Sequence, residues 1–383
     1  GAEALDANTT ASFNTSIGSS SLGANTTGHS NTAIGRAAMT RNTTASQNTA
    51  VGMNSMDHNT TGDNLASLGY NSMGANTTGT NNTAIGSKAM EDNTTGSNNT
   101  SIGFEALADN QNGNQNTAGG KRALKSNTSA TNNTAFGYHA LEENTTGADN
   151  TALGTSALTE NTTASNNTAI GSVALDANTT GANNTACGQA ALTSCTTGSD
   201  NAALGTGAGL ALTTGSNNLL LGHDAGRTGS PGGNITTTSN EIVLGDENIT
   251  QANVQVDWTV ASDKRDKTDV TPMEMGLDFV NKLEPVTYKW DKRSKYVEKG
   301  EDFRELITDG THKEDWLDTG FLAQDVEVLE SEYGYNIADK TNLTTTLSDD
   351  GNQYGLTYSK FIPMLVKAIQ ELSAQVEELK SKS

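Results

Sequence analysis

The chain has 383 residues and a net charge of −21, with 40 glycines, 4 prolines, 2 cysteines and only 33% hydrophobic residues. This is too little apolar material for two ordinary globular cores. The acidic balance argues against nucleic acid as a direct partner, because phosphate neutralisation needs clustered Lys and Arg, and no apolar run approaches bilayer thickness, so membrane insertion is not expected.

The first 222 residues repeat with a fixed period of 17. An asparagine recurs from Asn25 to Asn178, and an apolar Leu or Met recurs from Leu22 to Leu192, both at this spacing. A period without insertions predicts stacked, equivalent coils, since one insertion would shift every later coil. The clearest marker is a glycine that ends each Ala-Ile-Gly-like triplet: Gly18, Gly35, Gly52, Gly69, Gly86, Gly103, Gly120, Gly137, Gly154, Gly171, Gly188, Gly205 and Gly222.

Each repeat predicts one coil of a parallel β-solenoid or β-roll. Gly, Asn and Thr crowd every repeat and no apolar stripe has helical spacing, so helix is excluded. The Thr-Ala-Ile segment fits a short strand and Asn-Thr-Thr-Gly a turn, and we expect one or two strands and one inward Ile or Leu per coil. Thirteen coils make a rod of about 60 Å. Its core is thin for a lone chain, which favours a homotrimer whose sister chains cover the apolar residues.

The Asn-x-x-Ala-Ile-Gly-x-x-Ala pattern is similar to the head repeats of trimeric autotransporter adhesins, which form left-handed parallel β-rolls. Three roles are open for the rod: a stiff spacer, a receptor-binding surface, or an ice-binding threonine array. The residues predict no catalysis, metal site or cofactor in it. We expect His29, His58 and His139, which lack partners at metal-ligand spacing, to be surface residues. Cys187 and Cys195 are expected to be inert thiols or, alternatively, a disulfide.

Residues 223–261 form a predicted transition that would become the distal tip of the fibre. Gly245 follows Gly222 by 23 residues instead of 17, and the inserted stretch contains the loop 231–233. Residues 253–260 alternate in polarity and predict a strand. Exposed tips suit receptor contacts, and the candidates are His223, Asp224, Arg227 and Trp258.

A charged domain of mixed α/β type is predicted over residues 262–383. This stretch holds 16 of the 23 Lys and Arg and 25 of the 44 Asp and Glu, which places a boundary between Ala261 and Ser262. Residues 276–285 predict a helix closed by proline, 286–290 a strand, and 320–327 a strand-to-helix unit.

A long helix is predicted at the C-terminus, over about residues 360–381. Its apolar residues alternate at spacings of 3 and 4, which is the seam of a coiled coil that needs partner helices. The alternative is an amphipathic helix whose seam packs on its own domain. The predicted trimerisation residues are Ile362, Leu365, Ile369, Leu372, Val376 and Leu379.

These blocks resemble the C-terminal intramolecular chaperone domain of phage endosialidases and other tail fibres, which is related to a domain of myelin regulatory factor. The resemblance is carried by Ser-Asp-Lys-Arg-Asp-Lys at 262–267, Gly-Leu-Asp-Phe-Val-Asn-Lys-Leu at 276–283, Pro-Val-Thr-Tyr at 285–288, Gly-Phe-Leu-Ala-Gln-Asp-Val-Glu at 320–327, and the stretch 358–372. It implies trimerisation, assisted folding, and release by autoproteolysis with a serine–lysine dyad, here Ser262 and Lys267. Where that family often has an apolar residue before the lysine, this chain has Asp266.

The chemistry of such a dyad is independent of the resemblance. A Ser262 hydroxyl can attack the carbonyl of Ala261 and form an ester that water cleaves. The base would be the Lys267 amine, which must be desolvated or placed near a cation to lose its proton. The neighbouring carboxylate of Asp266 favours the charged lysine and opposes this role, unless folding turns it away.

The sequence therefore predicts a self-cleaving viral tail fibre that forms a homotrimer on the virion. Its expected partners are a host cell-surface receptor, either glycan or protein, and other virion tail proteins through an N-terminal part that is missing here. The alternatives are a trimeric adhesin on a bacterial surface, with a trimerisation domain that does not cleave, and an ice-binding solenoid.

Overall fold

The structure is a computed structural model that describes residues 1–255, 258–298 and 301–382. The chain divides into two compact units. The solenoid unit contains Gly1–Arg227 and Ile235–Asp246, and the C-terminal unit contains Thr228–Asn234 and Glu247–Ser383. No helix in the described ranges is both long and apolar enough to cross a membrane.

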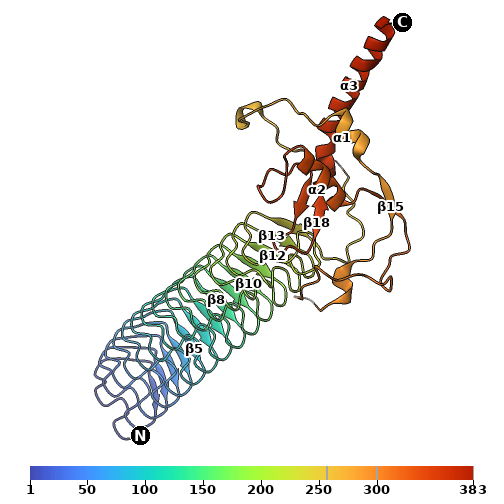
Figure 1. The fold of residues 1–383 in the computed structure, drawn as a ribbon. Coiled ribbons are helices and arrows are strands. Elements are labelled where there is room, and N and C mark those ends of the chain that lie inside the picture. Colours follow the sequence, from blue (N-terminus) through green and yellow to red (C-terminus); the bar gives the residue numbers. More distant parts are fainter. Residues whose placement is uncertain (256–257, 299–300, 383) are drawn as a thin grey trace. The chain divides into compact units, whose positions relative to one another are not determined.

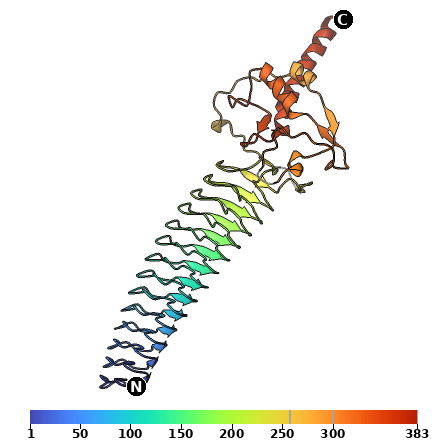
Figure 2. The ribbon, with the colours of Figure 1, turned by 60° about the horizontal axis from the view of Figure 1, so that its bottom comes forward.

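The solenoid unit is a stack of coils that each add one strand to a single parallel sheet of 14 strands (Figure 1). The strands pair in chain order, and each residue of β1 lies beside the residue 17 positions later in β2. Figure 2 shows the strands aligned along one side of the stacked coils. The strands are β1 Thr15–Ile17, β2 Thr32–Ile34, β3 Thr49–Val51, β4 Ala66–Leu68, β5 Thr83–Ile85, β6 Thr100–Ile102, β7 Thr117–Gly119, β8 Thr134–Phe136, β9 Thr151–Leu153, β10 Thr168–Ile170, β11 Thr185–Cys187, β12 Ala202–Leu204, β13 Leu219–Leu221 and β14 Ile242–Leu244. The predicted solenoid and its 17-residue coil are confirmed.

The core of each coil is built from the small middle residue of the strand and one larger apolar residue. Ala33 in β2 and Met39 after it are both fully buried. Of the expected inward Ile or Leu, the Leu or Met position is the one that points inward, since Ile34 is 37% exposed. In a three-residue strand the side chains alternate, so when the middle residue points inward the third must point outward.

Two ladders of buried asparagine satisfy the backbone where the coil turns. In one ladder, Asn42 Nδ2 donates to Asn25 Oδ1 of the preceding coil (2.8 Å) and to the carbonyl of Ala45 (3.1 Å). In the other, the backbone N–H of Asn48 donates to Asn31 Oδ1 (3.1 Å). Buried polar groups are stable only when bonded in this way, so the asparagines of the repeat are structural.

The repeated glycine allows successive coils to approach closely. Gly35 has a φ of +136°, and a Cβ on it would lie 2.4 Å from the carbonyl oxygen of Gly52 in the next coil. Any side chain would clash with that backbone, which explains why the glycine keeps the period.

The C-terminal unit is small and mixed in secondary structure. The helix α1 (Leu277–Lys282) precedes β15 (Val286–Tyr288), which pairs antiparallel with β16 (Asp318–Gly320). The helix α2 (Ala323–Glu332), the hairpin of β17 (Thr345–Leu347) and β18 (Tyr354–Leu356), and the 22-residue helix α3 (Phe361–Lys382) follow. The predicted helix-strand order is confirmed. The predicted strand over 253–260 is wrong for 253–255 and 258–260, which form no strand, and its residues 256 and 257 lie outside the described residues.

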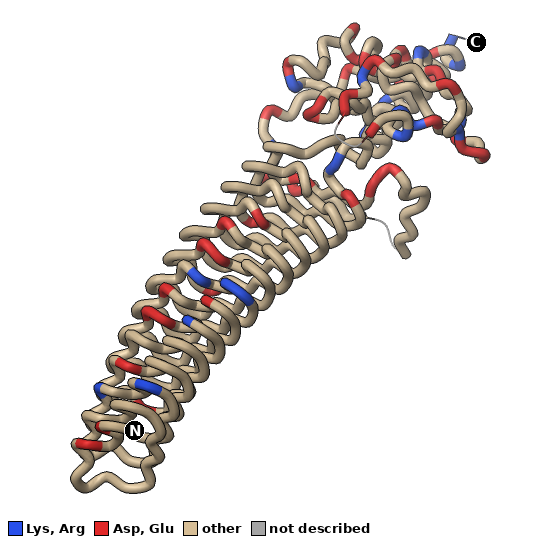
Figure 3. Tube along the Cα trace, turned by 90° about the horizontal axis from the view of Figure 1, so that it is seen from below, with Lys and Arg blue, Asp and Glu red and all other residues tan. Residues whose placement is uncertain are grey.

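A compact core holds this unit together. It contains Met275, Phe279, Val326, Phe361 and Met364. Near it, the buried carboxylate of Glu330 accepts hydrogen bonds of 2.6 Å from the backbone and hydroxyl of Thr344 and from the hydroxyl of Thr345. Charged residues are sparse along the solenoid coils and dense in this unit (Figure 3).

Candidate functional site

Ser262 and Lys267 lie at the two ends of a tight turn in the C-terminal unit. A short 3₁₀ helix, Lys264–Asp266, reverses the chain between them. Asp263 caps this helix: its carboxylate accepts a hydrogen bond of 2.9 Å from the backbone N–H of Arg265. The guanidinium of Arg265 also pairs with Asp263 at 2.6 Å, and the hydrogen bonds from Arg265 hold the pKa of the Asp263 carboxyl below its usual range.

This turn brings the two predicted dyad residues into direct contact. Lys267 Nζ lies 2.6 Å from Ser262 Oγ and donates a hydrogen bond to it. A hydroxyl and an amine at this distance can exchange a proton, which is the geometric requirement for a serine activated by a lysine base. The catalytic role of both residues stays a prediction.

The carboxylate of Asp266 is the group that the sequence expects to oppose the dyad. Within the described residues, Asp266 forms no ion pair with Lys267, and the acidic side chain that is engaged in the turn is Asp263, which pairs with Arg265.

The whole turn is exposed in a single chain. Ala261, Ser262 and Lys267 all belong to an exposed stretch, and the 3₁₀ helix between them buries no residue. A lysine acts as the base of such a dyad only in its neutral form, which desolvation favours. One chain thus supplies the contact between serine and lysine but not the water-free surroundings that would activate it.

The predicted trimerisation seam is exposed along α3. A different face of the helix, with Phe361, Met364 and Ala368, packs into the core of the unit. The alternative in which the seam packs on its own domain does not hold for the single chain. The seam residues are exposed as follows: Ile362 61%, Leu365 45%, Ile369 63%, Leu372 49%, Val376 40% and Leu379 69%.

The four weak receptor candidates have different surroundings. Trp258 is 77% exposed, as a contact residue should be. Asp224 is buried and pairs with Arg227, with 2.7 Å between Oδ1 and Nη1. His223 lies against Asp224 and against Asp246, a residue that the sequence did not single out.

Two expectations about the other candidate residues need revision. His139 is only partly exposed, with 21% of its side chain in solvent: its Nδ1 lies 2.5 Å from Oε2 of the buried Glu142, and its ring stacks on Tyr138. The i, i+3 spacing of His139 and Glu142 could have shown this pair if the coil backbone had been known. Cys187 and Cys195 are both free thiols, so the disulfide alternative is wrong for this fold.

The comparisons with known proteins concern the C-terminal unit. Residues 262–335 match the model of a peptidase family described as chaperone of endosialidase. The matched stretch begins at Ser262 and contains Lys267, α1, β15, β16 and α2. The match implies the self-cleaving peptidase activity of that class of domain. No curated protein and no solved structure gives a significant match to this chain.

Proposed function

From the family match of residues 262–335, we propose that this chain is a trimeric viral fibre whose C-terminal unit assembles three chains and then cuts itself off between Ala261 and Ser262. The observation that carries the proposal is the 2.6 Å contact between Ser262 Oγ and Lys267 Nζ at the first residues of the matched stretch. The solenoid would be the mature fibre, and the C-terminal unit its folding helper.

The cleavage follows from the position of Ser262 directly after the bond that is cut. Its hydroxyl oxygen attacks the carbonyl carbon of Ala261 while the neutral Lys267 amine accepts the hydroxyl proton. The bond between the Ala261 carbonyl carbon and the Ser262 nitrogen breaks, and an ester to Ser262 Oγ forms; the proton passes to the released Ser262 amine. Water then hydrolyses the ester, which leaves a carboxylate on Ala261 and regenerates the serine hydroxyl.

Assembly would switch this reaction on. The dyad is exposed in one chain, and burying it between chains would remove water from the lysine and favour its neutral form. Cleavage would then report that three chains have come together. A chain that remains alone would stay uncut, which keeps the helper attached until it has acted.

Two exposed apolar surfaces support the trimer. The first is the seam of α3, and coiled-coil seams of this spacing need partner helices. The second runs along the solenoid, where the third residue of the strands points outward; a soluble protein rarely leaves such a long apolar stripe in water. The large apolar members of this strand stripe that are between 37% and 58% exposed are Ile17, Ile34, Leu68, Ile85, Ile102, Phe136, Ile170, Leu204 and Leu244.

The repeats explain why a helper would be useful. Successive coils of the solenoid are nearly equivalent, so three chains that meet through the strand stripe could pair with a shift of one coil at little cost. A coiled coil at the C-terminus fixes the register of the chains and raises their effective concentration. After its release the fibre could not easily refold, which would make it kinetically stable.

Electrophoresis in SDS tests the proposed cleavage with wild type, Ser262→Ala and Lys267→Ala. Wild type should give fragments of 261 and 122 residues, because residues 1–261 and 262–383 are separated. Both variants should stay at 383 residues. Lys264→Ala is the matched control, since it removes a lysine of the same turn that does not contact Ser262, and it should still be cut. Uncut wild type would contradict autoproteolysis and would favour the bacterial trimeric adhesin with a non-cleaving domain.

The proposed location and partners follow from this assignment. A released trimeric fibre belongs on a virion, with the solenoid as spacer or receptor-binding surface and Trp258 as an exposed candidate contact for a host-surface glycan or protein. Pull-down of the cut fibre on host cells, with Trp258→Ala compared to wild type, tests whether this residue contributes.

A further inference from the structure

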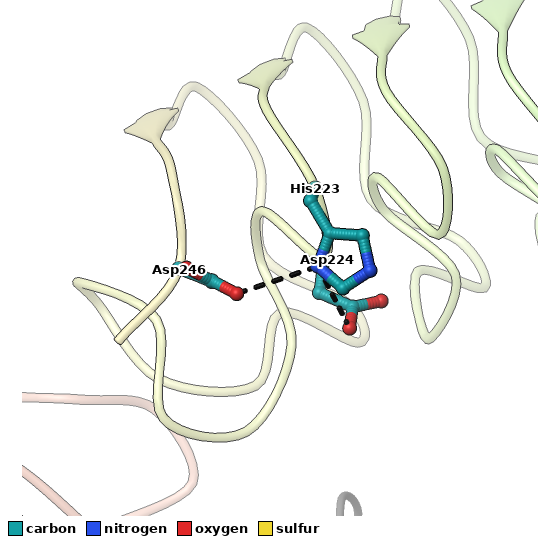
Figure 4. Close-up of side chains that lie close together, drawn as sticks. All are labelled: His223, Asp224 and Asp246. Atoms are coloured by element: carbon teal, nitrogen blue, oxygen red, sulfur yellow. Dashed lines mark hydrogen bonds and ion pairs between the residues drawn. The ribbon is translucent and has the colours of Figure 1, made fainter. Parts of the chain in front are cut away.

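The last two coils of the solenoid bring three ligand-type side chains together. His223 follows Gly222 directly after β13, and Asp246 follows Gly245 directly after β14. The two residues therefore occupy equivalent positions in adjacent coils, although 23 residues separate them in sequence. Asp224, the next residue after His223, turns its carboxylate toward the same point (Figure 4).

The separations of these atoms are those of ligands around one metal ion. His223 Nδ1 lies 3.3 Å from Asp224 Oδ2 and 3.4 Å from Asp246 Oδ2, and all three ligand atoms lie within 4.8 Å of one another. Zinc binds imidazole nitrogen and carboxylate oxygen at about 2.0–2.2 Å with tetrahedral angles, so neighbouring ligand atoms lie about 3.3–3.5 Å apart. The ligand oxygens of Asp224 and Asp246, which lie within 4.8 Å of each other, would have to reach this spacing when an ion binds.

Arg227 orients the carboxylate of Asp224 toward His223. The guanidinium of Arg227 forms an ion pair with Oδ1 of Asp224 at 2.7 Å. The other carboxylate oxygen, Oδ2, is the one that lies near His223. Carboxylates that bind metals are commonly oriented by a second hydrogen bond of this kind. Both carboxylates are buried, Asp224 with 5% and Asp246 with 6% of the residue exposed, whereas the His223 side chain is 64% exposed. The site thus has a rigid inner side and one side open to solvent.

We propose that His223, Asp224 and Asp246 bind one divalent transition-metal ion, zinc in the best fit, that clamps the last two coils of the solenoid together. Imidazole combined with carboxylates suits zinc better than magnesium or calcium, which prefer a shell of oxygen ligands alone. Three protein ligands leave a fourth position for water or for a ligand from outside the coils.

The proposed site lies at the end of the solenoid, where a bond between coils would be useful. The regular coils hold each other at 17-residue spacing, but β14 is the terminal strand of the sheet and closes a coil of 23 residues. Terminal repeats of a solenoid serve as caps, and a bond to the preceding coil is one way to hold such a cap in place. A metal bridge between the equivalent positions 223 and 246 supplies it at the one coil where the period changes.

Spacing in the sequence did not reveal this site. The residues that stack with His223 and Asp246 in earlier coils are Ser19, Arg36, Met53, Tyr70, Ser87, Phe104, Lys121, Tyr138, Thr155, Ser172, Gln189 and Thr206. None of these is a His, Cys, Asp or Glu. Among the residues that follow the repeated glycine, only the last two, His223 and Asp246, can therefore bind a metal. The 23-residue separation is meaningful only once the coils are stacked.

Titration of the full-length protein tests the proposal. After removal of metal by a chelator and dialysis, zinc binding is measured by calorimetry, and cobalt serves as a visible probe of tetrahedral geometry. Wild type should bind one zinc ion per chain. His223→Ala and Asp246→Asn should lose this ion, whereas the control His58→Ala, which removes a half-exposed histidine beside Asp57, should keep it.

Hydrogen exchange separates a clamp from incidental binding. Zinc should slow exchange of the backbone amides in 219–246 of wild type and should leave those amides unchanged in His223→Ala, a variant that alters an exposed side chain and so keeps the fold. Absence of zinc binding in wild type, or equal binding in wild type and His223→Ala, overturns the proposal. In that case the contacts of His223 with Asp224 and Asp246 only join the last two coils to each other, without a metal.

Discussion

The two units of the chain bury their apolar residues in opposite ways. The solenoid has one continuous core from Leu22 to Val243, made of contacts between neighbouring coils, and it also buries its asparagine ladders. The C-terminal unit has a small core around Phe279 and leaves the whole seam of α3 in solvent. The solenoid thus packs most of its apolar residues within one chain and leaves the strand stripe exposed, whereas the C-terminal unit leaves the seam of its longest helix exposed.

This difference bears on how a fibre can be assembled from such a chain. Equivalent coils stabilise the rod but do not fix the register between neighbouring chains, because a shift of one chain by one coil restores almost every contact. The C-terminal unit has no internal repeat, so its surfaces can match in one arrangement only. A helper domain at the end of a repetitive rod therefore supplies what the rod lacks.

Breaking the seam of α3 should have the largest effect. We expect the double variant Leu365→Asp/Ile369→Asp to abolish both trimer formation and cleavage, since two buried charges per helix are incompatible with a coiled coil. Sedimentation analysis and SDS electrophoresis measure the two outcomes. Gln370→Asp, an exposed position outside the seam, is the matched control and should behave as wild type. A double variant that still trimerises and cuts would contradict the role of the seam.

Replacing single apolar residues of the solenoid should have smaller, position-dependent effects. Leu124→Ala removes a fully buried side chain and should lower the free energy of unfolding by about 2–5 kcal/mol, measured by urea denaturation. Ile102→Ala is the informative partner, because Ile102 is 46% exposed in the single chain. In the monomeric Leu365→Asp/Ile369→Asp variant, which we call the seam-broken monomer, Ile102→Ala should lower the free energy of unfolding by less than about 0.5 kcal/mol.

The assembled fibre should respond differently to Ile102→Ala. If the strand stripe faces the sister chains, the same substitution should cost about 2–5 kcal/mol per chain there, as a buried Ile does. An equally small cost in the monomer and in the trimer would show that the stripe is not part of the interface.

The sequence predicted the solenoid because its period is carried by residues with strict backbone demands. Gly35 and its equivalents cannot hold a side chain, and Asn42 and its equivalents bond the adjacent coil, so the 17-residue spacing is visible without a structure. The direction of Ile34 was not predictable, because an apolar residue at the end of a three-residue strand is read as core unless the trimer is known.

The candidate site shows the same limit. The family resemblance indicated Ser262 and Lys267 as a dyad, but their contact depends on the 3₁₀ turn that Asp263 caps. The cluster at His223 was missed because it joins residues across a coil of irregular length. The sequence indicated which residue types could react, but it did not indicate contacts between residues on different coils.

The cysteines offer a test that leaves stability almost unchanged. Cys187 occupies the outward position of β11, within the strand stripe, and is exposed in the single chain. Cys195 takes the place of an asparagine in the first ladder, where burial raises the pKa of its thiol to about 11. Thiolates are the reactive form, and a raised pKa keeps Cys195 protonated at pH 8, so it should not react in the native protein.

The number of thiols that react at pH 8 therefore reports whether Cys187, on the exposed strand stripe, is covered, while the buried Cys195 stays unreactive. The seam-broken monomer should show one reactive thiol, Cys187, and the denatured chain should show two. The assembled fibre should show none if the strand stripe lies between chains, because Cys187 is then covered by its neighbours. One reactive thiol per chain in the intact trimer would place the stripe in solvent and would leave the α3 seam as the part of the molecule that holds three chains together.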